Sequence, residues 1–259
     1  MKLTTAFGAI FRRDLALMRR YIFNSISSFV TLYIVFLLIF TGLRAFEGIA
    51  PGSTGSQTLE YYIVGFFMWS FAISAYSDLS WGLTNEAQAG TLEQLYLAPC
   101  GFRWISLFIT FSSLTLSLIP VVISLVAMMA TTGKWLSLDL VSLVPLMFIT
   151  VLGAVGIGYA LAGLALVFKR VQAAFQIMQF VFVGFQTVPT RLWWAKLLPL
   201  NAGNALIGEV MVNGRRLWEL PAGVVLVALA VGAAYLAAGM FVFSRCERVA
   251  KDRGLLGHY

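Results

Sequence analysis

Few side chains in this sequence have the types and spacing that covalent chemistry requires. The single histidine, His258, lies close to the end of the sequence, so there is no His-based catalytic triad and no histidine cluster for zinc. Gly133-Lys134 resembles part of a phosphate-binding loop but lacks the earlier glycine and the following hydroxyl. We therefore predict no catalytic residue, no metal site and no cofactor bound by this chain.

The most informative polar pattern is the stretch from Asn85 to Pro99, which lies between two long apolar runs. Thr91 can cap a helix here, and Gln94 three residues later completes a capping box. Glu93 lies in the first turn, where the helix dipole favours a negative charge. Gly90 before the cap and the proline at the end delimit a short helix.

One face of this predicted helix is apolar, because Leu92, Leu95 and Tyr96 follow the i, i+3, i+4 pattern. Two turns of helix are not stable alone in water, so this face must dock on something. Either it docks on a partner protein, or it rests on the membrane surface or on its own bundle.

The pattern Glu86, Gly90-Thr91-Leu92-Glu93, Leu95 and Pro99 closely resembles the cytoplasmic signature of ABC type-2 exporter permeases. In that family a short coupling helix presses into an ATPase subunit. The resemblance implies an ABC ATPase subunit as partner, with ATP and magnesium bound there, and a second permease copy, identical or similar. It assigns the ATPase contact to Glu86, Gly90, Thr91, Leu92, Glu93, Leu95, Tyr96 and Pro99.

Composition places the chain in a lipid bilayer. Of its 259 residues 60% are hydrophobic and only 11% are charged, and the mean hydropathy is +0.87. The net charge of +7 could suggest nucleic-acid binding in a soluble protein, but here the basic residues gather at the ends of apolar runs. We expect membrane lipids, and no nucleic acid, as partners.

The apolar runs predict one all-α transmembrane domain over residues 1–259, with six spans. An amphipathic helix at 3–22 precedes them and lies in the membrane interface. The coupling helix, 86–99, separates spans two and three, and residues 245–259 form a basic cytoplasmic tail. The spans are predicted at about 25–43, 61–83, 104–131, 140–168, 171–190 and 220–244.

Two side-chain stripes are candidates for a substrate pathway. Aromatic side chains on the first span fall within about 60° of one another on a helical wheel; they are Phe29, Tyr33, Phe36 and Phe40. Amides on the fifth span fall within about 80°; they are Gln172, Gln176, Gln179 and Gln186. Each stripe either lines the pathway or packs helices together, and the amides cannot comfortably face lipid.

The glycine- and alanine-rich fourth span should be packed centrally, because small residues let helices approach closely. Asp78 lies inside the second span, where a structural hydrogen bond or ion pair and proton coupling are both conceivable roles. Asp14 projects from the apolar side of the first helix, where it either reaches the lipid headgroups or pairs with a basic group on a neighbouring element.

Residues 191–219 carry interfacial character, with Trp193, Trp194 and Trp218 as anchors. The run 198–214 resembles the segment that ABC type-2 permeases fold into short helices in the outer leaflet. Six spans place both termini on one side, which also carries two thirds of the 18 Lys and Arg residues. The positive-inside rule therefore predicts cytoplasmic termini, and the resemblance implies the plasma (inner) membrane.

We interpret the sequence as the permease subunit of an ATP-driven ABC exporter rather than an enzyme. Aromatic and amide stripes together would suit an amphiphilic substrate such as a drug, a lipid or a lipid-linked glycan. One alternative is an ion- or proton-coupled secondary transporter, which would need ionisable groups at mid-membrane. A second alternative is a non-transporting membrane assembly component.

Overall fold

The computed structural model describes residues 3–49, 56–88, 97, 101–168 and 171–252. Within these ranges all regular elements are helical. They are α1 (Leu3–Arg20), α2 (Ile22–Ile49), α3 (Ser56–Gln88), α5 (Phe102–Thr132), α6 (Leu140–Phe168), α7 (Gln172–Thr187), η1 (Trp193–Leu197), α8 (Asn201–Met211), η2 (Leu217–Glu219) and α9 (Ala222–Asp252).

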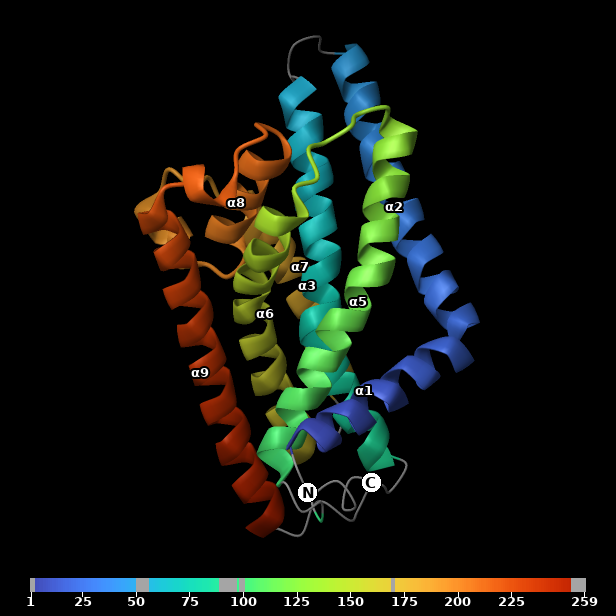
Figure 1. The fold of residues 1–259 in the computed structure, drawn as a ribbon, viewed down its shortest axis with the longest axis vertical. Coiled ribbons are helices and arrows are strands. Elements are labelled where there is room, and N and C mark those ends of the chain that lie inside the picture. Colours follow the sequence, from blue (N-terminus) through green and yellow to red (C-terminus); the bar gives the residue numbers. More distant parts are fainter. Residues whose placement is uncertain (1–2, 50–55, 89–96, 98–100, 169–170, 253–259) are drawn as a thin grey trace.

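The long helices form an elongated bundle whose two ends differ. Figure 1 shows the start of α1 and the end of α9 at the lower end, which we call the near end. The end of α3 and the start of α5 lie there too, whereas α8 and the link between α5 and α6 lie at the opposite, far end. The two ends of the described chain therefore share one side of the bundle.

Five helices are long and apolar enough to cross a membrane, namely α2, α3, α5, α6 and α9. The prediction of an all-helical, multi-pass fold is confirmed for the described residues. The predicted fifth span corresponds to α7, which has 16 residues and is about 24 Å long, against about 30 Å of hydrocarbon. Six crossings therefore stay a prediction.

Helix α1 has the amphipathic character expected of residues 3–22, and Figure 1 shows it rising from the near end to form an elbow with α2 at the side of the bundle. Ala6 is buried. The ring of Phe7 packs against two rings of α5, with centroid distances of 5.7 Å to Phe108 and 5.9 Å to Phe111. The apolar face of α1 is thus turned toward the bundle.

Helix α6 lies at the centre of the bundle, as its small residues predicted. A Cβ atom added at Gly156 would collide with the backbone of Tyr235 on α9, and one at Gly239 would collide with the backbone of Gly156. On another side, a Cβ at Gly158 would lie 2.6 Å from the carbonyl oxygen of Tyr76 on α3. Glycine is required at these positions because three backbones approach closely there.

Helix α9 extends further than the predicted sixth span. It continues to Asp252 through residues that were predicted to form the tail. No helix breaker occurs in this stretch, and Lys251 Nζ lies 2.7 Å from Glu247 Oε1, an ion pair at the i, i+4 spacing that supports helices.

Candidate functional site

The near end joins the end of α3 to α1. Glu86 lies in the last turn of α3, which continues through it to Gln88 because the next helix breaker is Gly90. Its Oε1 lies 3.6 Å from Arg13 Nη1 of α1. This ion pair ties the end of the second span to the first helix.

Asp14 lies beside this ion pair and is largely covered by the chain itself. Its side chain is only 13% exposed, and its Oδ1 lies 3.1 Å from the Nε of Arg13, its own neighbour in α1. Its Oδ2 is buried and has no hydrogen-bond partner among the described residues. Asp14 is also close enough to Asp78 of α3 for the two carboxylates to interact electrostatically.

Of the two roles that the sequence leaves open for Asp78, the structural hydrogen bond or ion pair finds no partner in the part of the chain that the structure describes. Among the described residues the structure records neither a hydrogen bond nor an ion pair for this carboxylate, and a second carboxylate lies nearby. A helical wheel shows which face of its helix Asp78 occupies. It does not show that α1 folds back against that face, so periodicity could not predict that Asp14 lies near Asp78.

Most of the predicted ATPase contact falls outside the described residues. Of its members only Glu86 is described, and the seven others, Gly90, Thr91, Leu92, Glu93, Leu95, Tyr96 and Pro99, are not. The short coupling helix thus stays a prediction.

The aromatic stripe on α2 forms a continuous stack. Neighbouring ring centroids are separated by 6.0 Å for Phe29 and Tyr33, 6.3 Å for Tyr33 and Phe36, and 5.6 Å for Phe36 and Phe40. Phe36 and Phe40 are buried, and the Phe36 ring lies 5.6 Å from the ring of Tyr62 on α3. The far half of the stripe therefore packs α2 against α3.

A matching stripe on α3 links α2 to α7. Phe66 lies one helical turn after Tyr62, and its ring centroid is 5.3 Å from that of Phe36 and 5.2 Å from that of Trp69. The indole Nε1 of Trp69 donates a 2.8 Å hydrogen bond to the carbonyl oxygen of Gln179 on α7. Helices α2 and α7 therefore both pack against the aromatic face of α3.

The glutamine stripe on α7 divides into two parts. Gln172 and Gln176 are exposed on the surface of the chain. Gln179 is half-buried, and Gln186 is half-buried with its Oε1 accepting a 3.3 Å hydrogen bond from Asn204 Nδ2 of α8. One end of the stripe thus joins helices of the same chain, while the other end faces outward.

Two asparagines of α8 fix the far end of α7. The Nδ2 of Asn201 donates 2.8 Å hydrogen bonds to the carbonyl oxygens of Phe185 and Val188. One carbonyl belongs to the last turn of α7 and the other to the residue that follows the helix, where Pro189 prevents the helix from continuing. Sequence reasoning missed both Asn201 and Asn204; their i, i+3 spacing was a signal, but it does not say which helix end they meet.

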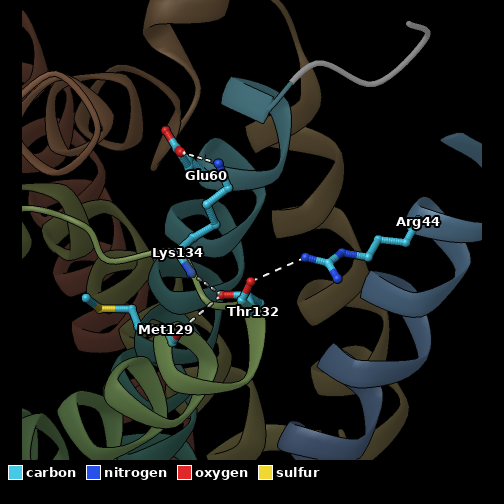
Figure 2. A network of polar contacts seen from close by, with 5 residues as sticks. All are labelled: Arg44, Glu60, Met129, Thr132 and Lys134. Atoms are coloured by element: carbon cyan, nitrogen blue, oxygen red, sulfur yellow. Dashed lines mark hydrogen bonds and ion pairs between the residues drawn. The ribbon is translucent and has the colours of Figure 1, made fainter. Parts of the chain in front are cut away.

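A separate polar network links helix ends at the far end of the bundle (Figure 2). The Nη2 of Arg44 on α2 donates a 3.3 Å hydrogen bond to the carbonyl oxygen of Thr132, at the end of α5. Lys134 Nζ lies 3.2 Å from Glu60 Oε1 of α3. The Arg44 guanidinium also lies 4.7 Å from the centre of the Phe40 ring. These contacts hold α2 and α3 to the end of α5.

Comparisons with protein-family models, with curated proteins and with solved structures found no match to this chain. The class of the protein therefore rests on its own fold and composition. Five helices of membrane-spanning length, joined in an all-helical arrangement over the described residues, define a multi-pass membrane protein.

Proposed function

We propose that this chain is the permease subunit of an ATP-driven ABC exporter in the plasma membrane. In this proposal it pairs with a second permease copy and recruits ATPase subunits to its near end. The structural observation that carries the proposal is the outward-facing amide pair Gln172 and Gln176 on α7.

An exposed glutamine is unfavourable against hydrocarbon, because its donors and acceptors find no partner there. Gln172 and Gln176 lie one turn apart at the start of α7, close to Lys169-Arg170 at the membrane boundary, and wherever this face lies within the hydrocarbon it requires either water or another polar helix. A second permease copy with a substrate pathway between the two chains supplies both. This supports a pathway beside α7 rather than through the packed centre of one chain.

The near-end contacts support coupling to an ATPase. Helix α3 ends and α5 begins at the near end (Figure 1), so a docking segment between them would be reached from the side on which α1 starts and α9 ends. The Arg13–Glu86 ion pair links the end of α3 to α1, so in this proposal α1 follows a displacement of α3. ATP-driven closure of the ATPase subunits would then move α1, α3 and α5 together and switch the pathway from inward to outward access.

The proposed substrate is an amphiphile, such as a drug, a lipid or a lipid-linked glycan. Exposed amides of α7 offer hydrogen bonds, and exposed apolar side chains on the same helix, Ile177 and Phe180, offer apolar contact. A pathway with this mixture suits a molecule that has both a polar and an apolar part.

A second candidate, a proton-coupled secondary transporter, is favoured by one observation. Asp14 and Asp78 are close enough to interact electrostatically and are both partly buried, and such a carboxylate pair can hold and release a proton. If transport in vesicles collapses with the proton gradient and persists without ATP, this second candidate replaces the first. The Asp78→Asn variant should then abolish transport, whereas in an ATP-driven exporter it leaves the ATP dependence intact.

Co-purification tests the proposal most simply. The tagged chain is extracted in mild detergent from its native host, and the eluate is assayed for an ATPase subunit and for ATP hydrolysis. The test variant is Leu95→Asp, which places a charge on the predicted docking face. The control is Leu97→Asp, because Leu97 falls on the opposite side of the same predicted helix and is 83% exposed.

The proposal predicts that the ATPase accompanies the wild type and the Leu97→Asp chain and is lost with Leu95→Asp. Absence of any ATPase from the wild type in several mild detergents contradicts the proposal. Equal loss from both variants contradicts the assignment of the docking face.

A further inference from the structure

A groove opens at the far end between two connecting segments. One segment links α5 to α6, and the other links α8 to α9. The groove has a volume of about 460 Å³ and is lined by Ser137, Leu138, Asp139, Val141, Gly214, Arg216 and Trp218. Its size and mixed lining suit a small polar group attached to an apolar molecule.

The groove lies at the level where the membrane ends. The candidate span in α5 ends at Thr132, and those in α6 and α9 begin at Leu140 and Ala222. Each of these residues is within a few positions of the residues that line the groove. Trp218 in its wall is 66% exposed, and exposed tryptophans are typical of the interface between hydrocarbon and headgroups. The molecules that surround this groove in a bilayer are therefore lipids.

Hydrogen bonds between the two segments fix the shape of the groove. The backbone N–H of Ser137 donates a 2.8 Å hydrogen bond to the carbonyl oxygen of Met211. The Oγ of Ser142 accepts a 2.9 Å hydrogen bond from the backbone N–H of Leu217 and donates one of 2.6 Å to Asp139 Oδ2. The groove is thus held open before any ligand binds, which lowers the entropic cost of binding.

The groove carries one basic and one acidic side chain. The Arg216 guanidinium lies 5.4 Å from the centre of the Trp218 ring. Two other cations of this end are paired with carboxylates, Lys134 with Glu60 at 3.2 Å and Arg215 with Glu209 at 3.4 Å. Among the described residues no carboxylate lies within ion-pair distance of Arg216, so this guanidinium remains able to bind an anion.

Asp139 supplies the opposite charge. Its Oδ1 accepts a 3.3 Å hydrogen bond from the backbone N–H of Val141, so it caps the start of α6. Each carboxylate oxygen keeps a further lone pair for a cation. Leu138 and Val141 add exposed apolar surface beside the two charges.

We propose that this groove binds the headgroup of a phospholipid that carries a primary ammonium. Arg216 binds the phosphate and Asp139 accepts hydrogen bonds from the ammonium, while Trp218, Leu138 and Val141 contact the first carbons of the acyl chains. The proposal does not depend on the transport function proposed above.

Native mass spectrometry of the purified full-length chain tests this site. The protein is incubated with phosphatidylethanolamine or with phosphatidylglycerol, and lipid adducts are counted. Arg216→Gln removes the cation of the groove. Arg215→Gln is its matched control, because the neighbouring arginine already pairs with Glu209. Asp139→Asn removes the negative charge but keeps a good helix cap, so the variant should fold normally.

The predicted results differ between the variants. Arg216→Gln lowers the affinity for both lipids about tenfold, as expected for the loss of a charge-assisted hydrogen bond, and Arg215→Gln leaves it unchanged. Asp139→Asn abolishes the preference for phosphatidylethanolamine over phosphatidylglycerol. Equal loss in Arg216→Gln and Arg215→Gln, or no loss in either, overturns the proposal, as does the absence of a lipid preference in the wild type.

A competition with soluble phosphoethanolamine separates a lipid from a free phosphate ester as the ligand. If the site binds lipid, millimolar phosphoethanolamine leaves the phosphatidylethanolamine adducts in place, because the acyl-chain contacts are missing from the competitor. If it displaces them fully, the headgroup alone carries the binding and the lipid assignment is overturned.

Discussion

Helices α7 and α9 both lie at the surface of the chain, but their exposed side chains differ in chemistry. From Ala222 to Val242 the exposed residues of α9 are alanine, glycine, leucine, valine and phenylalanine. Such a face is suited to lipid. The exposed face of α7 mixes apolar Ile177, Phe180 and Val183 with Gln172 and Gln176, and the two amides are not suited to lipid.

The two helices are also attached in different ways. Helix α9 packs backbone to backbone on α6 through Gly156 and Gly239. Helix α7 is held through the indole of Trp69 and the amide of Asn201. Close backbone packing fixes one side of α9 to α6, whereas α7 is attached at a few polar points, with Gln172 and Gln176 exposed. The proposed function therefore expects α7, and not α9, to meet something other than lipid.

The largest expected effect comes from breaking the α6–α9 contact. Gly156→Val should lower the free energy of unfolding by about 3 kcal/mol, because its side chain must displace the backbone of Tyr235. Thermal unfolding in detergent measures this. Gly184→Val on α7 is the control, since a Cβ there meets nothing within 4 Å. An equal loss in both variants would show that glycine matters here for reasons other than close packing.

The polar face of α7 should be reached by water. In a chain with Cys100→Ser and Cys246→Ser, a cysteine at Gln176 should react with a charged, membrane-impermeant thiol reagent about tenfold faster than one at Leu226 on α9, because only a hydrated thiol ionises readily. The labelling rate is read by gel shift. Equally slow reaction at both positions would mean that the glutamines pack against another helix and line no pathway.

The attachment of α7 should be sensitive to one hydrogen bond. Trp69→Phe keeps the ring contact with Phe66 but removes the donor to the carbonyl oxygen of Gln179, at a cost of about 1 kcal/mol. Hydrogen–deuterium exchange should increase in α7 and stay constant in α9. An equal increase of exchange in α7 and α9 would contradict the view that the two helices are attached to the bundle separately.

The smallest expected effect concerns the far-end ion pair between Lys134 and Glu60, which contacts neither α7 nor α9. Lys134 and Glu60 have partly exposed side chains, at 36% and 23%. A double-mutant cycle with Lys134→Gln and Glu60→Gln should give a coupling energy below about 1 kcal/mol. A coupling well above this would mean that the pair is far better shielded from solvent than its exposure indicates.

The sequence was sufficient to predict the long apolar helices. Apolar length located α2, α3, α5, α6 and α9, and the small residues of 140–168 indicated a central helix. The ends were less predictable. Helix α9 continues to Asp252 because an ion pair and the absence of a breaker extend it beyond the apolar run.

The candidate site was less predictable than the fold. A helical wheel places the four glutamines on one side of a helix but carries no information about the neighbours of that side. Gln186 accepts a hydrogen bond from Asn204, whereas Gln172 and Gln176 are exposed on the surface of the chain. Asp14 illustrates the same point, since its burial near Asp78 depends on how α1 folds back against α3.

Site-specific photo-crosslinking tests the central claim that α7 faces a second permease copy. A benzophenone amino acid replaces Phe180 on α7 in one variant and Leu226 on α9 in another; the two side chains are 67% and 63% exposed. After illumination of native membranes, we predict a protein adduct of about twice the mass of this chain from position 180 and only lipid adducts from position 226. Lipid adducts alone from position 180, or protein adducts from both, would contradict the account.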